Sequence, residues 1–405
     1  MIETIKELVR IPSVSGTPEV KDALRKALEI CEGLGFRTKN CDDLLGYGEI
    51  GQGDALIGIL CHLDVVPSGN GWKHDPFEAE VEDGRLYGRG VIDDKGPAVA
   101  AIYAMKDILA SSDPMNKRVR IIFGCMEETG EWADMEKYKA TEEMPSYGFT
   151  PDADFPAIYG EKGILMAELS MEAERAGFLR VVGGEAPNMV ADWAKAVLTD
   201  GTILSEKGKA AHGSMPEEGE NAITKLMEKA AEKNCPFAEF YMKKIGWSLD
   251  GSKCGCKFWD KASGGLTFNV GKILLEDGLV KLRVDIRYPV TYTQAQVLES
   301  LKAQVSDYGI TVQVLAAMNP VYMDKEGPVI TRLMEAYRQV TGDDTPAQLM
   351  GGGTYARAME NIVAFGPVFP GRECTEHQKD EYIYVEDLEK AREIYRIAIE
   401  KLLAM

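Results

Sequence analysis

Hydrophobic residues in the N-terminal part of the chain follow two spacings in turn. Residues 2–11, 18–35 and 95–110 place apolar side chains three and four positions apart, which predicts helices. Residues 55–61 and 118–125 are short continuous apolar runs, which are typical of strands buried in a parallel sheet. Strands that alternate with helices pack as a sheet with helices on its faces. The pattern therefore predicts an α/β fold with a mostly parallel sheet flanked by helices.

The pattern changes after residue 164. A helix is predicted over 221–233, and alternating runs within 265–290 predict strands joined by a glycine turn. Strand and helix signals return near residue 324, and one hydrophobic core seldom serves a chain of 405 residues. We therefore expect two domains: one formed by residues 1–164 plus 324–405, and an inserted α+β domain formed by residues 165–323.

The composition is that of a globular protein, with 45% hydrophobic and 27% charged residues. The formal net charge of -19 argues against nucleic acid or an anionic membrane as a partner, because both attract basic surfaces. No run of about 18 apolar residues predicts a membrane helix, and the N-terminus lacks the features of a secretion signal. We therefore expect a cytoplasmic protein whose eight scattered cysteines are free thiols.

Possible metal ligands follow apolar runs or turns at five separate places in the chain. These places contribute His62 and Asp64, Asp93, Glu127 and Glu128, Asp152, and His377. Several of them come directly after predicted strands, and ligands of such sheets bind beyond the carboxyl ends of the strands. Together these side chains could hold two metal ions, which makes the protein a candidate hydrolase.

Each place also has an ordinary structural explanation. His62 could be a strand-end histidine held by Asp64, since residues two apart in an extended chain point to the same side. Asp93 and Asp94 precede a predicted helix, where carboxylates typically cap the N-terminus. The other acidic residues could lie in solvated turns, and His377 could be a surface histidine.

Longer motifs surround these places. They read HLDVVPSGNGW, PFEAEVEDGRLYGRGVIDDKGP, EETG, GFTPDADFPAIYGEKG, AAHGSMPEEGENA, DIRYP, GGGTYAR and ECTEHQKDEYI. With these motifs spread in order along nearly the whole chain, the sequence resembles the M20 metallopeptidases that bind two metal ions, most closely the bacterial dipeptidases of the PepV type. The resemblance implies that the first predicted domain is catalytic and that the insert is a lid.

Carried over by position, the resemblance implies two metal sites that share one aspartate. The sites consist of His62, Asp93 and Asp152, and of Asp93, Glu128 and His377. Glu127 would be the general base that takes a proton from the attacking water and returns it to the leaving amine. Asp64 would orient His62. The implied cofactors are two divalent ions, with zinc expected and manganese or cobalt also suited to such ligands.

The same resemblance implies that the insert contacts the substrate. His212 would contact the negative charge that develops on the substrate carbonyl. Asn188 and Arg287 would hold the substrate carboxylate, because an arginine fork pairs with both carboxylate oxygens. The backbone would approach the substrate closely at Gly351, Gly352 and Gly353. An ordinary ion pair for Arg287 and a flexible loop for the glycines are the alternatives.

The predicted activity is hydrolysis of the peptide bond of dipeptides with a free amino terminus, so the expected partner is a small peptide. One alternative is a deacylase that uses the same metals on N-acyl amino acids. Another, from a different class, is an inactive metal-binding or interaction protein, which the presence of Glu127 and all five ligands disfavours. The insert has a length between those of related lids, so a monomer and a homodimer both stay open.

Overall fold

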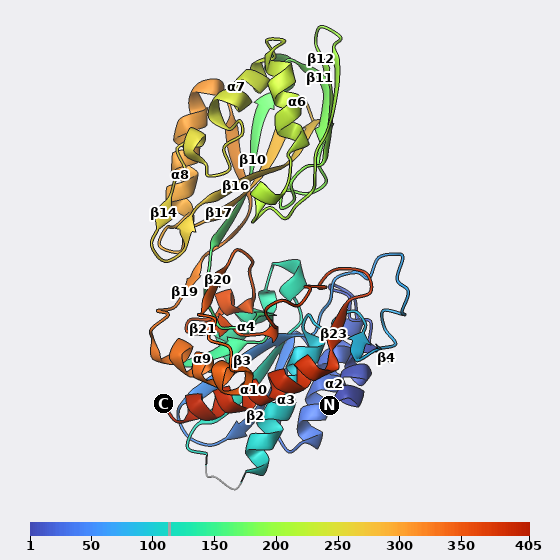
Figure 1. Ribbon diagram of the computed structural model, residues 1–405, viewed down its shortest axis with the longest axis vertical. Coiled ribbons are helices and arrows are strands. Elements are labelled where there is room, and N and C mark those ends of the chain that lie inside the picture. The colour runs from blue at the N-terminus through green and yellow to red at the C-terminus, as the bar shows by residue number, and fades with distance from the viewer. Residues whose placement is uncertain (112–114) are drawn as a thin grey trace. The chain divides into compact units, whose positions relative to one another are not determined.

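The computed structural model describes residues 1–111 and 115–405, and these form two compact units (Figure 1). The first unit comprises residues 1–159, 323–348 and 354–405, and the second comprises residues 160–322 and 349–353.

This division differs from the predicted one at its borders. The second unit begins before residue 165, and it includes residues 349–353, which we expected in the catalytic domain. The guanidinium of Arg287 donates a hydrogen bond of 2.9 Å to the backbone oxygen of Gly351, which ties this segment to the second unit. Sequence spacing could not show this contact, because the two residues are far apart in the chain.

The first unit is built on a mixed sheet. Six of its strands lie in the order β1 (Arg37–Cys41), β2 (Leu45–Gly51), β6 (Arg118–Gly124), β3 (Leu56–His62), β7 (Tyr147–Thr150) and β21 (Ile362–Ala364). β3 is parallel to β6 and to β7, and β21 is parallel to β7. All of β3 is buried, which explains its continuous apolar sequence. The strands predicted over 55–61 and 118–125 are confirmed as β3 and β6, and so is the α/β class.

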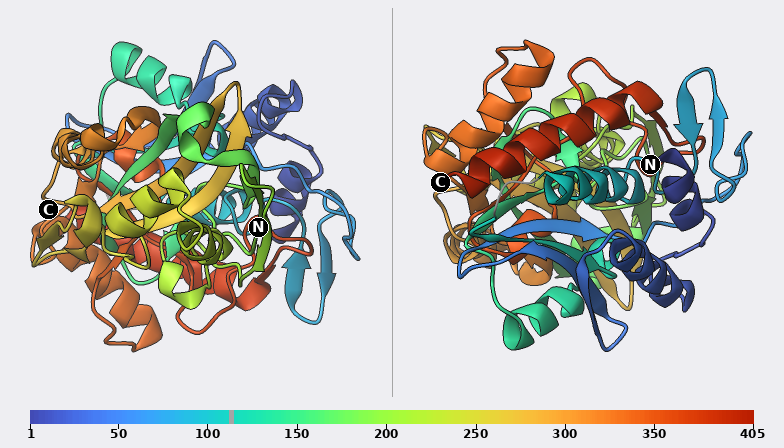
Figure 2. Two further views of the ribbon diagram at one scale, coloured as in Figure 1. Left: turned by 90° about the horizontal axis from the view of Figure 1, so that it is seen from above. Right: turned by 90° about the horizontal axis from the view of Figure 1, so that it is seen from below.

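The larger helices of the first unit are α1 (Ile2–Val9), α2 (Glu19–Gly33), α3 (Lys95–Ala110), α4 (Ala133–Thr141), α9 (Pro328–Thr341) and α10 (Val385–Leu403). α3 is buried along most of its length, because it packs against β3 and β6 and lies beside α10 (Figure 2). A helix enclosed in this way needs apolar residues on all sides, and its sequence provides them. The helices predicted over 2–11, 18–35 and 95–110 are confirmed.

Short strands complete the first unit. They are β4 (Glu80–Glu82), β5 (Arg85–Tyr87), β8 (Ala153–Asp154), β22 (Pro367–Val368) and β23 (Tyr382–Tyr384). β23 pairs with β5, and β22 pairs with β8. Both pairings join the C-terminal part of the chain to segments near its beginning or middle.

Two buried tyrosines of this unit differ in how their hydroxyl groups are satisfied. The Tyr138 hydroxyl donates to the backbone oxygen of Glu143 and accepts from Arg120, both at 2.8 Å. The Tyr395 hydroxyl has no partner among the described residues, and its ring stacks on Phe149. Deleting one partner of a buried hydrogen bond costs about 1–3 kcal/mol, because the other partner stays unsatisfied.

We therefore expect Tyr138→Phe to lower the free energy of unfolding by about 1–3 kcal/mol. Tyr395→Phe should leave it unchanged or raise it, since no bond is lost. Urea unfolding of both variants and the wild type measures this difference. Equal losses in the two variants would contradict the expectation.

The second unit contains a seven-stranded antiparallel sheet. Its order is β13 (Ile203–Lys207), β12 (Trp193–Leu198), β11 (Phe178–Gly183), β16 (Thr267–Glu276), β17 (Leu279–Tyr288), β10 (Gly163–Glu172) and β18 (Thr311–Met318). The accompanying helices are α6 (Ala222–Ala231), α7 (Pro236–Lys244) and α8 (Gln294–Val305). The predicted helix over 221–233 and the strands within 265–290 are confirmed as α6, β16 and β17. Across the described part of the chain, no helix is long and apolar enough to cross a membrane.

Candidate metal centre

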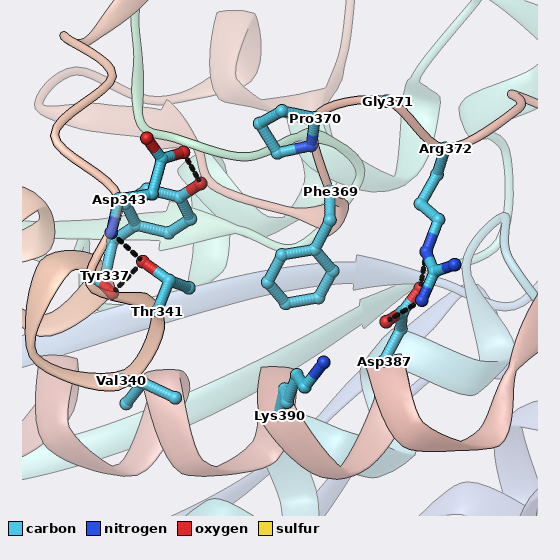
Figure 3. Close-up of a pocket in the computed structure, with 10 residues that line it drawn as sticks. All are labelled: Tyr337, Val340, Thr341, Asp343, Phe369, Pro370, Gly371, Arg372, Asp387 and Lys390. Atoms are coloured by element: carbon cyan, nitrogen blue, oxygen red, sulfur yellow. Dashed lines mark hydrogen bonds and ion pairs between the residues drawn. The ribbon is translucent and has the colours of Figure 1, made fainter.

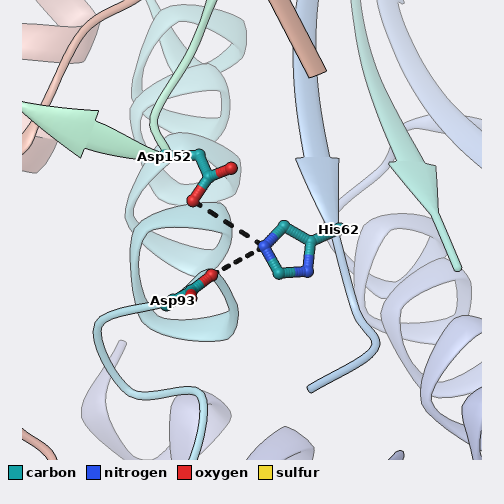
Figure 4. A group of neighbouring side chains, drawn as sticks. All are labelled: His62, Asp93 and Asp152. Carbon is teal, nitrogen blue, oxygen red and sulfur yellow. Dashed lines mark hydrogen bonds and ion pairs between the residues drawn. The ribbon is translucent and has the colours of Figure 1, made fainter. Parts of the chain in front are cut away.

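His62 is the last residue of β3, and its imidazole faces two carboxylates (Figure 4). Nε2 lies 2.7 Å from Oδ1 of Asp93 and 3.7 Å from Oδ1 of Asp152. Nδ1 lies 2.9 Å from the backbone oxygen of Asp64. Because a carbonyl oxygen only accepts, Nδ1 carries the hydrogen of the neutral ring and Nε2 has the free electron pair. That electron pair is directed at the two carboxylates, as a metal ligand requires.

A second group shares Asp93 with the first. Nε2 of His377 lies 2.9 Å from Oδ2 of Asp93 and 3.1 Å from the carboxylate of Glu128. Asp93 thus presents one oxygen to His62 and the other to His377. Within each group of three, one ligand atom from every residue lies within 4.8 Å of the others. The structure therefore brings together all five residues that we expected to be ligands.

Several carboxylates are crowded in this cluster, and burial and their mutual charges shift the pKa values of its members. Burial raises the pKa of Asp152 to about 7. Hydrogen bonds to Asp93 and Glu128 raise the pKa of His377 to about 11. Burial disfavours the cation of His62, but the carboxylates led by Asp152 outweigh it and raise the imidazole pKa. Crowded carboxylates behave in this way when no cation offsets them, and three ligands per group suit two divalent ions.

Glu127 and Glu128 follow β6 in a short turn, η1 (Glu127–Thr129). The register of β3 and β6 pairs His62 with Gly124, so this turn begins at the edge of the sheet where His62 lies. Burial, reinforced by the charge of Asp152, raises the pKa of Glu127 well above its usual value. Glu127 therefore lies beside the ligands without belonging to either group of three.

Asp64 holds His62 mainly through its backbone. Its backbone oxygen makes the close contact to the imidazole, whereas its carboxylate stays 3.5 Å from Nδ1. The carboxylate instead accepts backbone N–H groups of Glu127 and Glu128, each at 3.2 Å, and the hydroxyl of Ser15 at 2.7 Å. Asp64 thus connects the end of β3 to the glutamate turn.

Asp94 occupies the N-cap position of α3, but its side chain makes no capping hydrogen bond. The capping explanation is therefore wrong for this residue. Its Oδ2 accepts the backbone N–H of His62 at 3.2 Å. The side chains of Asp93 and Asp94 both contact His62 and do not cap the helix. Helix α3 begins directly after them, close to the end of β3.

Two supporting residues were not predicted from the sequence, although one of them, Tyr355, lies in the GGGTYAR motif. Asp134 accepts the backbone N–H groups of Cys125 and Met126, at 2.7 and 3.0 Å, just before Glu127. The hydroxyl of Tyr355 donates to the same carboxylate at 2.5 Å. These hydrogen bonds hold the backbone of Cys125 and Met126, which lead into the glutamate turn. The residues concerned come from separate segments, so their spacing in the sequence does not show that they are in contact.

The first unit also contains a separate pocket of about 400 Å³ (Figure 3). It is lined by Tyr337, Val340, Thr341, Asp343, Phe369, Pro370, Gly371, Arg372, Asp387 and Lys390. None of the metal-centre residues belongs to this lining. The guanidinium of Arg372 is engaged by the carboxylate of Asp387, with Nε 2.7 Å from Oδ2. This pocket is therefore not the metal centre.

The expected substrate-contacting residues all lie in the second unit. Nε and Nη2 of Arg287 donate to Oδ2 of Asp285, at 3.1 and 2.7 Å, and both residues are buried. Nη1 reaches the backbone of Gly351. The backbone oxygen of Asn188 accepts the N–H of Gly213, beside His212, at 2.7 Å. Arg287 is thus no surface ion pair, and its unit holds it next to the glycine segment.

The surroundings of His212 determine its neutral tautomer. Nδ1 accepts the backbone N–H of Ser214 at 3.3 Å and lies 2.6 Å from the hydroxyl of the same residue. The ring hydrogen is therefore on Nε2, which leaves a free donor. Partial burial and the nearby charge of Arg287 lower the pKa of His212.

We expect NMR spectra of ¹⁵N-labelled protein to show the Nε2–H tautomer for His212 and a pKa below 6.5. The assignment is secure because the chain has four histidines, and His212→Gln removes one signal. An Nδ1–H tautomer, or a pKa above 6.5, would contradict this description of the site.

Comparisons with known proteins identify relatives in sequence and in fold. A curated protein named "Putative dipeptidase YtjP", from Bacillus subtilis (strain 168), is 37% identical, and the match covers 99% of this chain and 97% of that protein. The crystal structure of human carnosine dipeptidase 1 matches with a TM-score of 0.66 at 18% identity, over 100% of this chain and 96% of that chain. At this identity the structural match shows the fold.

A second solved structure, the Bacillus subtilis YXEP protein, is described as a dinuclear metal binding peptidase from the M20 family. It matches with a TM-score of 0.56 at 13% identity, over 98% of this chain and 96% of that chain. The sequence profile of Peptidase family M20/M25/M40 matches residues 58–401, which include the five candidate ligands and Glu127. The resemblance seen in the sequence is thereby confirmed, and the chain belongs to the peptidase family M20/M25/M40.

Proposed function

We propose that the protein is a metal-dependent dipeptidase that hydrolyses the peptide bond of dipeptides with a free amino terminus. The observation that carries this proposal is the pair of ligand groups that share Asp93 and lie beside Glu127. The relative named as a dipeptidase, which matches over nearly its whole length, supports the substrate class. Zinc is the expected ion in both sites, with manganese and cobalt as alternatives. The expected location is the cytoplasm.

In this proposal His62, Asp93 and Asp152 hold one divalent ion, and Asp93, Glu128 and His377 hold the other. The ions, when bound, polarise the scissile carbonyl and make a water easier to deprotonate. Each group has three protein ligands, which leaves room for water or substrate.

Glu127 then acts as the general base. Its carboxylate is not used as a ligand in either group, and a carboxylate placed beside the ligands can accept a proton from a water. It takes a proton from the attacking water and returns it to the nitrogen of the leaving amino acid. Asp64 keeps Glu127 in place through the backbone N–H and orients His62 through its carbonyl.

The second unit supplies contacts to the substrate. The free Nε2–H of His212 is suited to stabilise negative charge on the carbonyl oxygen. Arg287 uses only some of its five N–H groups on Asp285 and Gly351, so Nη1 and Nη2 can still bind the substrate carboxylate. Asn188 would assist Arg287. The glycine segment, Gly351, Gly352 and Gly353, would lie along the substrate backbone.

A panel of free dipeptides assayed beside their N-acetylated counterparts, with protein loaded with zinc or manganese, tests the proposal. We expect kcat/KM for the free dipeptides to be higher by at least about tenfold, which corresponds to about 1.4 kcal/mol of transition-state binding. Preference for the acetylated set would identify a deacylase with the same metal chemistry. Absence of turnover with both sets would favour a metal-binding protein without activity.

A further inference from the structure

Behind the metal centre lies a buried ion pair that the proposed chemistry does not use. The side chains of Arg89 and Glu381 are only 2% and 1% exposed, and Nη1 of Arg89 lies 2.5 Å from Oε2 of Glu381. Arg89 precedes the ligand Asp93 by a few residues, and Glu381 follows the ligand His377 by a few residues. The pair therefore joins the two chain segments that supply these ligands.

The second oxygen of Glu381 binds the loop that leads to Asp93. Oε1 accepts the backbone N–H of Gly90 at 2.9 Å and that of Ile92 at 3.1 Å. The backbone oxygen of Glu381 also accepts the N–H of Gly88 at 3.0 Å. One residue thus holds three amides of the segment immediately before Asp93.

On the other side, Glu381 is fixed relative to His377. The hydroxyl of Thr375 donates to the backbone oxygen of Tyr382 at 2.9 Å and accepts its N–H at 3.1 Å, which closes the loop that carries His377. Tyr382 begins β23, which pairs with β5. A shift of the Glu381 carboxylate would therefore change the position of Asp93 relative to His377.

Stability alone does not explain this pair. Burial raises the pKa of Glu381 to about 8, and Nε of Arg89 has no partner among the described residues. Buried ion pairs seldom repay the cost of removing both charges from water, and apolar replacements are often as stable. The Arg89–Glu381 pair leaves Nε of Arg89 without a partner among the described residues, yet it lies between the two segments that carry Asp93 and His377. This placement indicates that the pair sets the geometry of those segments.

We propose that Glu381 is a positioning residue of the metal centre, which sets the spacing of Asp93 and His377 by bonding Arg89, Gly90 and Ile92. The inference rests on the dinuclear site proposed above. Partners that orient metal ligands typically change metal affinity by about 10–100-fold when they are removed. Since Asp93 belongs to both groups of three, we expect both ions to bind more weakly without the Glu381 carboxylate.

The test titrates cobalt(II) into metal-free full-length protein and records the visible absorption of the bound ion, with dissociation constants measured by competition with a chelator. Glu381→Gln removes the charge but keeps an oxygen for the loop amides. The double variant Arg89→Leu with Glu381→Leu removes both charges and leaves no unpaired ion, so it serves if the single variant does not fold.

A matched control lies elsewhere in the same unit. Glu49 and Arg120 form another buried pair, with Nε and Nη2 of Arg120 at 2.9 and 2.7 Å from Oε2 of Glu49. Among the described residues, the other hydrogen bonds and ion pairs of their side chains go to Arg37, Arg118, Tyr138 and Glu143, none of which is a metal-centre residue. Glu49→Gln should lower the thermal midpoint of unfolding but leave cobalt affinity and absorption unchanged. Glu381→Gln should weaken cobalt binding by about 10–100-fold and alter the absorption spectrum.

If Glu381→Gln or the double variant bound cobalt with the affinity and the absorption spectrum of the wild type, the positioning role would be overturned. The proposed dinuclear site would be unaffected by that result. Equal changes in the Glu381 and Glu49 variants would overturn it as well, because the effect would then be one of general stability. If the wild type itself binds no cobalt, the dinuclear site fails and the inference fails with it.

Discussion

Glu127→Gln is expected to lower kcat by about 10²–10⁴-fold or more while both metal ions remain bound. Glutamine has nearly the shape of glutamate but cannot accept a proton at neutral pH. Glu127 lies outside both ligand groups, so its replacement removes no ligand. The bond from its backbone N–H to Asp64 does not depend on the side chain, so the turn should keep its shape. Steady-state rates and metal content measured on the same samples show both effects.

The matched control for this variant is Glu131→Gln. Glu131 is an exposed carboxylate just beyond the same turn, and its backbone N–H bonds the hydroxyl of Thr129. The change of charge is the same, so kcat should stay within about twofold of the wild type, as expected for a surface residue. A rate for Glu127→Gln close to that of Glu131→Gln would refute the general-base role. A loss of metal in Glu127→Gln would instead make Glu127 a ligand.

The sequence predicted that the five candidate ligands meet, partly because two of them follow strongly patterned strands. His62 ends a fully apolar strand, and Glu128 comes just after a second strand that is parallel to it. Parallel strands end at one edge of the sheet, so residues far apart in the chain had to meet there. Asp93 precedes a helix that packs on the same two strands. Local pattern and topology therefore predicted that candidate ligands meet at this edge, and the family resemblance implied how they divide into two sites.

The residues that support the ligands could not be found in this way. Asp134, Tyr355 and Glu381 act through contacts with other segments. Tyr355 and Glu381 lie within the GGGTYAR and ECTEHQKDEYI motifs, but the motifs do not show which contacts they make. The atom through which Asp64 holds His62 could not be predicted, for a related reason. Residues two apart share one side of an extended chain, but spacing does not say whether a carbonyl or a carboxylate makes the bond. Every residue has a backbone carbonyl, so the residue type does not indicate which carbonyl accepts a hydrogen bond.

The largest effect on metal content is expected from Asp93→Ala. Asp93 offers Oδ1 to the group with His62 and Oδ2 to the group with His377, so its loss removes one ligand from each site. Both ions should then bind more than about 100-fold more weakly, beyond the range for residues that only orient a ligand. The variant should hold less than one tightly bound ion per chain by elemental analysis after dialysis.

Single histidine variants distinguish two sites with a shared ligand from one undivided cluster. His62→Ala should leave one ion held by Asp93, Glu128 and His377, because none of these ligands needs His62 to reach the others. His377→Ala should leave one ion on the opposite group by the same reasoning. His74→Ala is the control, since His74 pairs with Glu80, stacks on Tyr87 and belongs to neither group.

If both histidine variants lost both ions, the two groups would act as one site. Asp93 would then be a ligand of that single site and would not connect two separate ones. If Asp93→Ala kept one tight ion, Asp93 would belong to one site only, and the close approach of both histidines to its carboxylate would need another explanation. The order expected from the geometry is two ions in the wild type and in His74→Ala, one ion in either ligand-histidine variant, and none held tightly in Asp93→Ala.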